Sequence, residues 1–318
     1  MRLKPMRLIS ADELKQVLDY SSLIDAIDAM FKEGCTTPVR HHHSIDTPDG
    51  LDPTLLIMPA WRQGDVIGVK IVTVFPENGE VSLPAVMGSY MLIDGKNGTP
   101  LAMLDGAELT ARRTASASAV ASRYLSRDDA STLLVVGTGV LAPHLIRAHA
   151  AVRPISDIMV WGRKFEKAQT VVGAFSNETF AVRAVDSLEE AVVGADIISC
   201  ATLSREPLVY GKWLVPGQHL DLIGGFTPEM READDECVRR ARVYCDTRAG
   251  AMKEAGDLVQ PLANGALQSE DVLGDLFDMA AGDCPLRGSA DDITYFKSAG
   301  TALEDLAAAK LAFERLKD

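Results

Sequence analysis

The sequence has few of the features that mark secreted, membrane-bound or nucleic-acid-binding proteins. Only five of its 318 residues are cysteine, and no two form a CxxC pair, which is typical of reduced thiols and not of a disulfide framework or zinc site. No hydrophobic run is long enough to span a bilayer, and the N-terminus has no apolar signal core. The formal net charge of −13 leaves no excess of cations for nucleic acid or an anionic membrane. These absences predict a cytoplasmic protein that binds neither nucleic acid nor membranes.

A strand, a glycine turn and a helix start follow one another at residues 133–142. The apolar run at 133–136 predicts a buried parallel strand. Gly137 and Gly139 allow a tight turn and a close backbone approach to a diphosphate, and Ala142 is small enough for the next helix to pack near the strand. Unpaired N–H groups and the helix dipole then favour an anion. The residues expected to contact a dinucleotide here are Gly137, Thr138, Gly139, Val140 and Leu141.

The context of this turn decides between a dinucleotide site and a purely structural turn. Further apolar strands are expected at 158–161, 195–202 and 219–225, separated by helical segments such as 164–174 and 187–193. Strands that alternate with helices predict an α/β protein with a Rossmann-type, doubly wound parallel sheet. Because the glycine turn lies in such a context, we favour a dinucleotide site.

The second strand indicates which dinucleotide binds. NAD-selective sites have Asp or Glu at its end to hold the ribose 2′-hydroxyl, whereas an arginine accommodates a 2′-phosphate. Here Trp161 is followed by Gly162, Arg163 and Lys164, without an acid. NADPH is therefore the preferred cofactor, with NADH as the second choice. In the alternative interpretation, Arg163 and Lys164 merely solvate a helix start.

Cations elsewhere in the chain are candidates for the substrate site. Lys70 lies in the apolar strand expected at 66–75, where an ammonium is costly to bury unless an anion meets it. It either faces a ligand or reaches water from an edge strand. Arg113 lies in a small-residue helix expected at 107–125 and could hold a carboxylate in a bidentate fork or belong to a solvated helix start. Three histidines at 41–43 suggest a metal, but no cysteine or carboxylate cluster completes a ligand set, so no metal site is predicted.

The chain is long enough for two domains. Residues 126–295 are expected to form the Rossmann domain. Residues 1–125, together with the final amphipathic helix in 296–318, are expected to form a second, discontinuous α+β domain. A first helical unit is expected at 10–33, with Ser10 as its N-cap.

Several short motifs together resemble the ornithine cyclodeaminase and μ-crystallin family over essentially the whole chain. They are Gly68-Val69-Lys70 with Phe75-Pro76, Leu109-Thr110 with Arg113-Thr114-Ala115, Gly137-Thr138-Gly139, and Phe296-Lys297-Ser298 with Gly300. Residues 160–163, 256–257 and 296–298 most resemble the bacterial Δ1-pyrroline-2-carboxylate reductases. Those enzymes reduce a cyclic imino acid to L-proline with NAD(P)H.

The resemblance implies a homodimer whose first, substrate-binding domain supplies the subunit contact, with the active site in the cleft between domains. It also implies that Lys70 and Arg113 meet the substrate carboxylate, with Arg40 as a helper. The other residues assigned to the cofactor are Thr114, Thr202, Lys297, Ser298 and Gly300.

One departure from the family pattern separates the candidate reactions. Cyclodeaminases of the family have a catalytic Asp in the loop after the fourth strand, and here Phe226 stands in its place. A phenyl ring cannot accept or donate the protons of an amine, although Glu229 or Glu232 could take the place of the missing Asp. We therefore expect an NAD(P)H-dependent imine reductase acting on Δ1-pyrroline-2-carboxylate, or on Δ1-piperideine-2-carboxylate to give L-pipecolate. The alternatives are an ornithine cyclodeaminase, an alanine-type amino acid dehydrogenase and a non-catalytic, crystallin-like NADP-binding protein.

Overall fold

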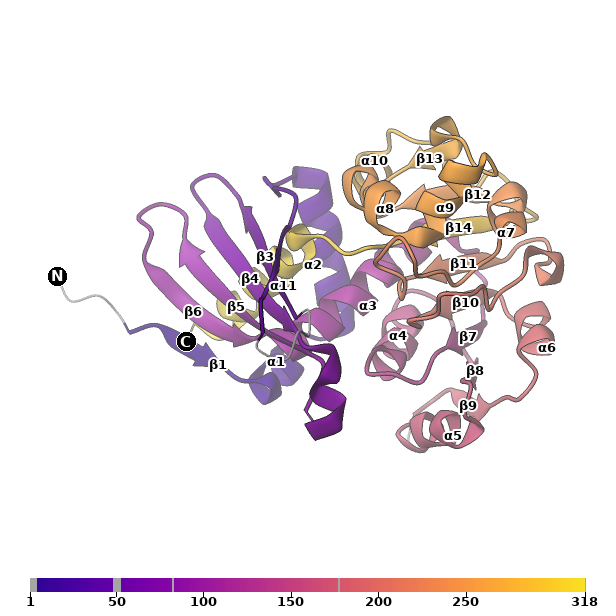
Figure 1. Cartoon of the computed structure of the whole chain (residues 1–318), viewed down its shortest axis with the longest axis horizontal. Helices are drawn as coiled ribbons and strands as arrows, with labels where there is room; N and C mark the ends of the chain where they lie inside the picture. Colours follow the sequence, from indigo (N-terminus) through magenta and orange to yellow (C-terminus); the bar gives the residue numbers. More distant parts are fainter. Residues whose placement is uncertain (1–4, 48–52, 82, 177, 318) are drawn as a thin grey trace. The chain divides into compact units, whose positions relative to one another are not determined.

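The computed structural model describes residues 5–47, 53–81, 83–176 and 178–317, and the chain folds into two compact units (Figure 1). Unit 1 consists of Met1–Arg113 and Thr301–Asp318, and unit 2 of Thr114–Gly300. The chain therefore leaves unit 1, forms unit 2 and returns with its last helix. Within the described residues, no helix has both the length and the apolar character needed to cross a membrane.

Both boundaries differ from the expected ones at 125/126 and 295/296. Unit 1 ends at Arg113, within the helix α3 (Gly106–Leu125), whose second half belongs to unit 2. The strand β14 (Thr294–Lys297) pairs in parallel with two strands of unit 2. These ladder hydrogen bonds hold residues 296–297 in unit 2, although the sequence motif that contains them leads directly into the final helix.

Unit 1 is built on a six-stranded sheet with the order β1-β6-β5-β4-β3-β2. Strand β1 pairs in parallel with β6, and the remaining described neighbours pair in antiparallel fashion. The strands are β1 (Arg7–Ile9), β2 (His41–Ser44), β3 (Thr54–Trp61), β4 (Val66–Val74), β5 (Val86–Asp94) and β6 (Pro100–Asp105). The helices are α1 (Ala11–Val17), α2 (Tyr20–Glu33), the 3₁₀ helix η1 (Pro76–Val81), the first part of α3, and α11 (Ala302–Arg315).

The expected helical unit at 10–33 is two helices. Ser10 does cap α1 through the predicted capping box, in which the Ser10 hydroxyl accepts from the Glu13 N–H and Glu13 accepts from the Ser10 N–H. The side chain of Asp19 then accepts from the Ser22 N–H and caps α2. Apolar spacing alone does not reveal this break, because an aspartate N-cap can also occupy an exposed helical position.

Alternate residues of β4 face opposite sides of the sheet. Gly68 and Lys70 lie on the side covered by α11, where a Cβ on Gly68 would lie 1.8 Å from the Tyr90 hydroxyl and 2.9 Å from Leu306 of α11. Because β4 has β3 and β5 as neighbours and Lys70 is only 2% exposed, the edge-strand interpretation of Lys70 is wrong. The other face of β4 carries Ile71, which is 44% exposed.

Unit 2 is a doubly wound α/β unit, as predicted. Its eight strands are all parallel in the order β13-β12-β14-β11-β10-β7-β8-β9. The strands are β7 (Thr132–Val136), β8 (Asp157–Trp161), β9 (Ala181–Ala184), β10 (Ile197–Cys200), β11 (His219–Leu222), β12 (Arg242–Cys245), β13 (Val272–Gly274) and β14. The helices are α4 (Leu141–Ala150), α5 (Phe165–Gly173), α6 (Leu188–Val193), η2 (Gly211–Trp213), α7 (Asp235–Arg240), α8 (Arg248–Glu254), α9 (Gly256–Asn264), η3 (Ser269–Asp271) and α10 (Leu276–Ala281).

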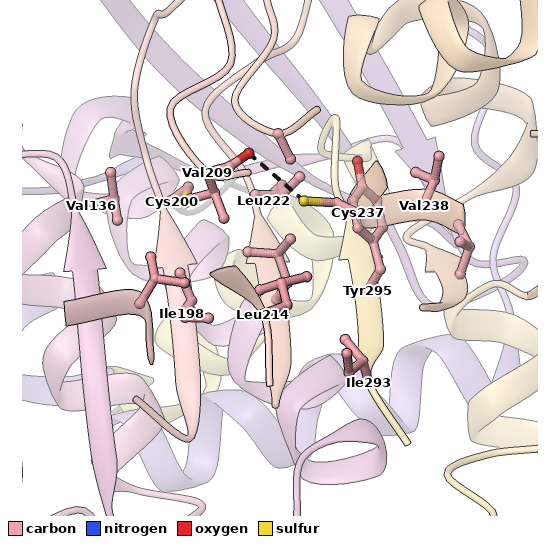
Figure 2. Close-up of a cluster of buried hydrophobic side chains, with 14 of the residues drawn as sticks. Val136, Ile198, Cys200, Val209, Leu214, Leu222, Cys237, Val238, Ile293 and Tyr295 are labelled. Carbon is pink, nitrogen blue, oxygen red and sulfur yellow. Dashed lines mark hydrogen bonds between the residues drawn. The ribbon is translucent and has the colours of Figure 1, made fainter. Parts of the chain in front are cut away.

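An apolar cluster packs on one side of this sheet (Figure 2). Val136, Ile198, Leu222 and Tyr295 project into it from four neighbouring strands, and all are fully buried. Cys237 joins them, with its thiol 3.7 Å from the Val209 carbonyl oxygen. Because these strands pair in parallel, their carboxyl ends lie along one edge of the sheet.

Candidate functional site

The carboxyl ends of the unit 2 strands form one row, which we call the carboxyl edge. The residues paired along it are Trp161, Val136, Cys200, Leu222 and Lys297. The glycine turn, the Gly162–Lys164 segment, Thr202 and the Ser298–Gly300 segment all follow directly from strands of this row. The structure thus brings together the residues assigned to the cofactor, except Thr114 on α3. Open α/β sheets bind dinucleotides at such an edge.

The glycine turn fits a diphosphate. Gly137 has φ +128°, and a Cβ there would lie 2.6 Å from the Ala201 carbonyl oxygen, so the position requires glycine. A Cβ on Gly139 would meet no atom within 4 Å, which leaves room above the turn. Helix α4 begins at Leu141 without a side-chain cap from Val140. In its first turn the Ala142 N–H donates to the Gly139 carbonyl at 3.1 Å and Pro143 has no N–H. The Leu141 N–H and the glycine turn are therefore the groups suited to an anion.

The segment after β8 has a tightly packed glycine followed by exposed cations. A Cβ on Gly162 would lie 2.5 Å from the Thr138 side chain, so these two residues pack against each other. Arg163 and Lys164 are exposed, and the Trp161 indole N–H donates to the Asp186 carbonyl at 3.1 Å. Both cations therefore lie beside the glycine turn, next to the end of β8.

A buried group of charges holds the loop that follows β11. The Glu232 carboxylate accepts from the Thr202 N–H at 2.6 Å, the Thr202 hydroxyl at 2.8 Å and the Gly224 N–H at 2.8 Å. Lys297 Nζ lies 2.9 Å from Asp257 Oδ2 and 3.8 Å from Glu232 Oε2. Burial raises the pKa of Glu232, against the lowering effect of Lys297. Glu232 is thus a buried anchor for backbone groups. Lys297, which is fully buried, is a counter-ion that Glu232 shares with the nearer Asp257.

A second buried carboxylate shapes the segment after β14. Asp246 Oδ2 accepts from the Ser298 hydroxyl at 2.9 Å and from the N–H groups of Ala299 and Gly300 at 2.8 and 2.6 Å. The sequence motif assigns Ser298 and Gly300 to the cofactor but gives no sign of Asp246, which lies 52 residues before Ser298. The bonds that these residues make within unit 2 indicate that they shape the carboxyl edge.

Unit 1 contains a buried cluster of opposite charges, which we call the charge cluster. Lys70 Nζ lies 2.8 Å from Asp305 Oδ2. Arg113 donates from Nε to Asp305 Oδ1 at 2.9 Å and from Nη1 to Glu304 Oε2 at 2.5 Å. All four side chains are 8% exposed or less. The sequence predicts that Lys70 and Arg113 lie together but does not reveal either acid.

The charges around Lys70, including that of Arg40, act on its protonation. Burial and the Arg113 charge lower the pKa of Lys70 to about 8, against the raising effect of Asp305, and Arg40 contributes to the lowering. Although burial opposes its charge, Asp305 and then Glu304 raise the pKa of Arg113. Lys70 and Arg113 thus share Asp305, which brings two cations close together in a buried place.

Known proteins resemble the chain over nearly its whole length. A model of the ornithine cyclodeaminase/mu-crystallin family matches residues 7–318. An uncharacterized protein of Schizosaccharomyces pombe is 44% identical over 97% of each chain. A Delta(1)-pyrroline-2-carboxylate reductase of Colwellia psychrerythraea is 37% identical over 98% of this chain and 100% of its own.

Two solved structures share the fold to a similar extent. One is the Delta(1)-pyrroline-2-carboxylate reductase of Thermococcus litoralis in complex with NADH and L-proline, at 32% identity, a TM-score of 0.92 and 98% coverage of both chains. The other is an archaeal alanine dehydrogenase dimer with bound NAD, at 26% identity and a TM-score of 0.90, with 98% of this chain and 96% of the other covered.

Proposed function

The chain belongs to the ornithine cyclodeaminase/mu-crystallin family, and we propose that it is an NAD(P)H-dependent reductase of a cyclic imino acid. The substrate is Δ1-pyrroline-2-carboxylate and the product L-proline. The observation that carries the proposal is the buried charge cluster, in which Asp305 contacts both Lys70 and Arg113 and so holds the two cations side by side. The relatives named as reductases of this imine support it.

Two groups of residues have separate tasks in this reaction. The glycine turn and the first turn of α4 hold the diphosphate of the dinucleotide, which supplies the hydride when bound. Lys70, Arg113 and Arg40 hold the substrate carboxylate, and this fixes the orientation of the adjacent imine carbon. Addition of a hydride to that carbon and of a proton to the ring nitrogen converts the imine into the amine.

The loop after β11 disfavours ornithine cyclisation. Phe226 is 40% exposed where cyclodeaminases have their catalytic Asp. Glu232 is buried and bound to backbone N–H groups, so it is not available to exchange protons with a substrate. Glu229 is exposed to solvent. Reduction of an imine that has already formed needs no carboxylate at this position.

A panel of substrates tests the proposal. With purified protein we expect NADPH oxidation on addition of Δ1-pyrroline-2-carboxylate, with L-proline as the product. The six-membered Δ1-piperideine-2-carboxylate reports the tolerance of ring size. Turnover of pyruvate with ammonia instead would identify an amino acid dehydrogenase, and ammonia release from ornithine would identify a cyclodeaminase. NADPH binding without any turnover would identify a binding protein.

We also propose that NADPH is preferred, through Arg163. Arg163→Ala should raise the KM for NADPH about tenfold, the effect of one charge-assisted hydrogen bond to the 2′-phosphate, and leave the KM for NADH nearly unchanged. Lys253→Ala, at an exposed lysine on α8 of the same unit, is the control. Equal effects of Arg163→Ala on both cofactors would contradict the assignment. A carboxylate at the end of β8 favours NADH, so an introduced Asp should shift the preference. Arg163→Asp is the variant to test, because the side chain of Gly162→Asp would collide with Thr138.

We further propose that the protein is a homodimer joined through the face of the unit 1 sheet opposite α11. That face carries exposed apolar residues: Trp61, Ile71 and Met87 are 37%, 44% and 40% exposed. The archaeal alanine dehydrogenase neighbour is a dimer, which supports the proposal. Sedimentation should show a dimer that Ile71→Asp converts to monomer, whereas Val193→Asp on α6 leaves it intact. A wild-type monomer at micromolar concentration would contradict the proposal.

A further inference from the structure

We propose that Asp305 is a positioning residue for the substrate carboxylate: it holds Lys70 and Arg113 side by side so that both charges face one ligand. This inference rests on the proposed function of the charge cluster. Asp305 uses both carboxylate oxygens, Oδ2 at 2.8 Å from Lys70 Nζ and Oδ1 at 2.9 Å from Arg113 Nε. Its side chain is fully buried.

The two cations come from different elements, and nothing in the local sequence of either brings them together. Lys70 lies on β4 and Arg113 on α3, whereas Asp305 lies in the first turn of α11. Two like charges in a low-dielectric interior repel strongly, and they stay close only if an anion lies between them. Asp305 is the carboxylate that contacts both.

Glu304 completes the arrangement around the guanidinium. It accepts from Arg113 Nη1, while Asp305 accepts from Nε. These two bonds fix the plane of the guanidinium, whose Nη2 carries further N–H groups for a ligand carboxylate. Glu304 therefore orients Arg113, whereas Asp305 couples Arg113 to Lys70.

Asp305 also acts on the protonation of Lys70. The charged and titratable groups around Lys70 are Arg113 of α3, Asp305 and Glu304 of α11, Arg40 ahead of β2, and Tyr90 of β5. Burial raises the pKa of Tyr90 well above its usual value, so this phenol stays neutral. Asp305 raises the pKa of Lys70, whereas burial and the two arginines lower it. Removing the Asp305 charge should therefore make Lys70 lose its proton at a lower pH.

Asp305→Asn tests the inference, with Asp305→Glu as the conservative variant and Glu108→Gln as the control. Glu108 pairs with Arg112 on the same helix α3, outside the charge cluster. We expect Asp305→Asn to raise the KM for Δ1-pyrroline-2-carboxylate at least about tenfold, as expected for a disturbed charged contact, and to move the alkaline limb of kcat/KM to lower pH. Asp305→Glu should recover part of both effects, and Glu108→Gln should change neither.

A readout that does not depend on turnover separates this inference from the proposed function. In protein labelled with ¹³C at lysine Cε, the NMR titration of Lys70 should move to lower pH in Asp305→Asn and partly back in Asp305→Glu. If this shift occurs but the wild-type protein does not reduce the imine, the proposed function is overturned, and with it a substrate role for Asp305. An active Asp305→Asn variant with wild-type KM and an unmoved Lys70 titration would overturn the inference alone. If Asp305→Asn does not fold, an unchanged KM and titration in Asp305→Glu would overturn the inference in the same way.

Discussion

Lys70→Met is expected to lower kcat/KM for Δ1-pyrroline-2-carboxylate by about two to three orders of magnitude, the usual effect of truncating one partner of a buried charge pair. Methionine keeps most of the volume on β4 and removes the charge, so the loss reports the carboxylate contact. NADPH affinity should stay unchanged, because the glycine turn lies in unit 2. Steady-state kinetics and NADPH titration on the same sample measure both. Wild-type kcat/KM in this variant would show that the substrate site is misplaced.

The structure changes what Lys70→Met should do to stability. From the sequence alone, removal of a buried cation tends to relieve a desolvation cost, so the variant should still fold. Asp305 lies 2.8 Å from the Lys70 ammonium, however, and loses one of its two cations. Since Arg113 still neutralises it, we expect a loss of about 1–3 kcal/mol, below the usual cost of a fully orphaned buried charge. Thermal unfolding of the variant should therefore occur below the wild-type temperature.

Arg113→Met should damage catalysis to a similar extent and stability more. Arg113 is bound to both Glu304 and Asp305, so its removal takes one cation from each of these buried acids. We expect a stability loss of about 3–5 kcal/mol, the range for breaking a buried ion pair. Arg113→Lys should lose less stability but still raise KM, because an ammonium lacks the planar fork. A stability loss smaller than that of Lys70→Met would contradict the contact pattern.

The double variant tests whether both cations hold the same carboxylate. If they do, the effects of Lys70→Met and Arg113→Met on kcat/KM should combine to less than their sum in free energy, because either single change already loosens the ligand. Additive effects would indicate two separate contacts. The free energy of unfolding is measured for the same set: the wild type, the two single variants and the double variant. This shows whether any non-additivity in kcat/KM arises from substrate binding or from the stability of the folded protein.

Local signals explain what the sequence predicts well. The turn before α4 requires a residue without a Cβ at position 137, where φ is positive, and the glycine there is visible in the sequence. The long apolar strand β4 and the Ser10 capping box are likewise encoded by neighbouring residues. Strands β9, β12 and β13, of three or four residues, are not among the strands expected from the sequence. Length alone does not explain this, because β10 and β11 have four residues each and lie within the strands expected at 195–202 and 219–225.

The acids of the charge cluster leave no such local signal. Asp305 lies 192 residues from Arg113, and acids in the first turn of a helix are ordinary partners of the helix dipole. Only the packing of α11 on β4 turns Asp305 into a counter-ion. The roles of Glu232 and Asp246 also arise from tertiary structure, since both bind backbone groups of distant segments.

The most direct test of a carboxylate-binding charge cluster compares two substrates that differ only in that carboxylate. Δ1-Pyrroline-2-carboxylate and Δ1-pyrroline share the five-membered cyclic imine, and only the first has the carboxylate. We predict that kcat/KM for NADPH-dependent reduction is higher for the carboxylate by about two orders of magnitude or more, and that Lys70→Met removes most of this difference. Equal values for the two imines in the wild-type protein would contradict the assignment of the charge cluster as the substrate site.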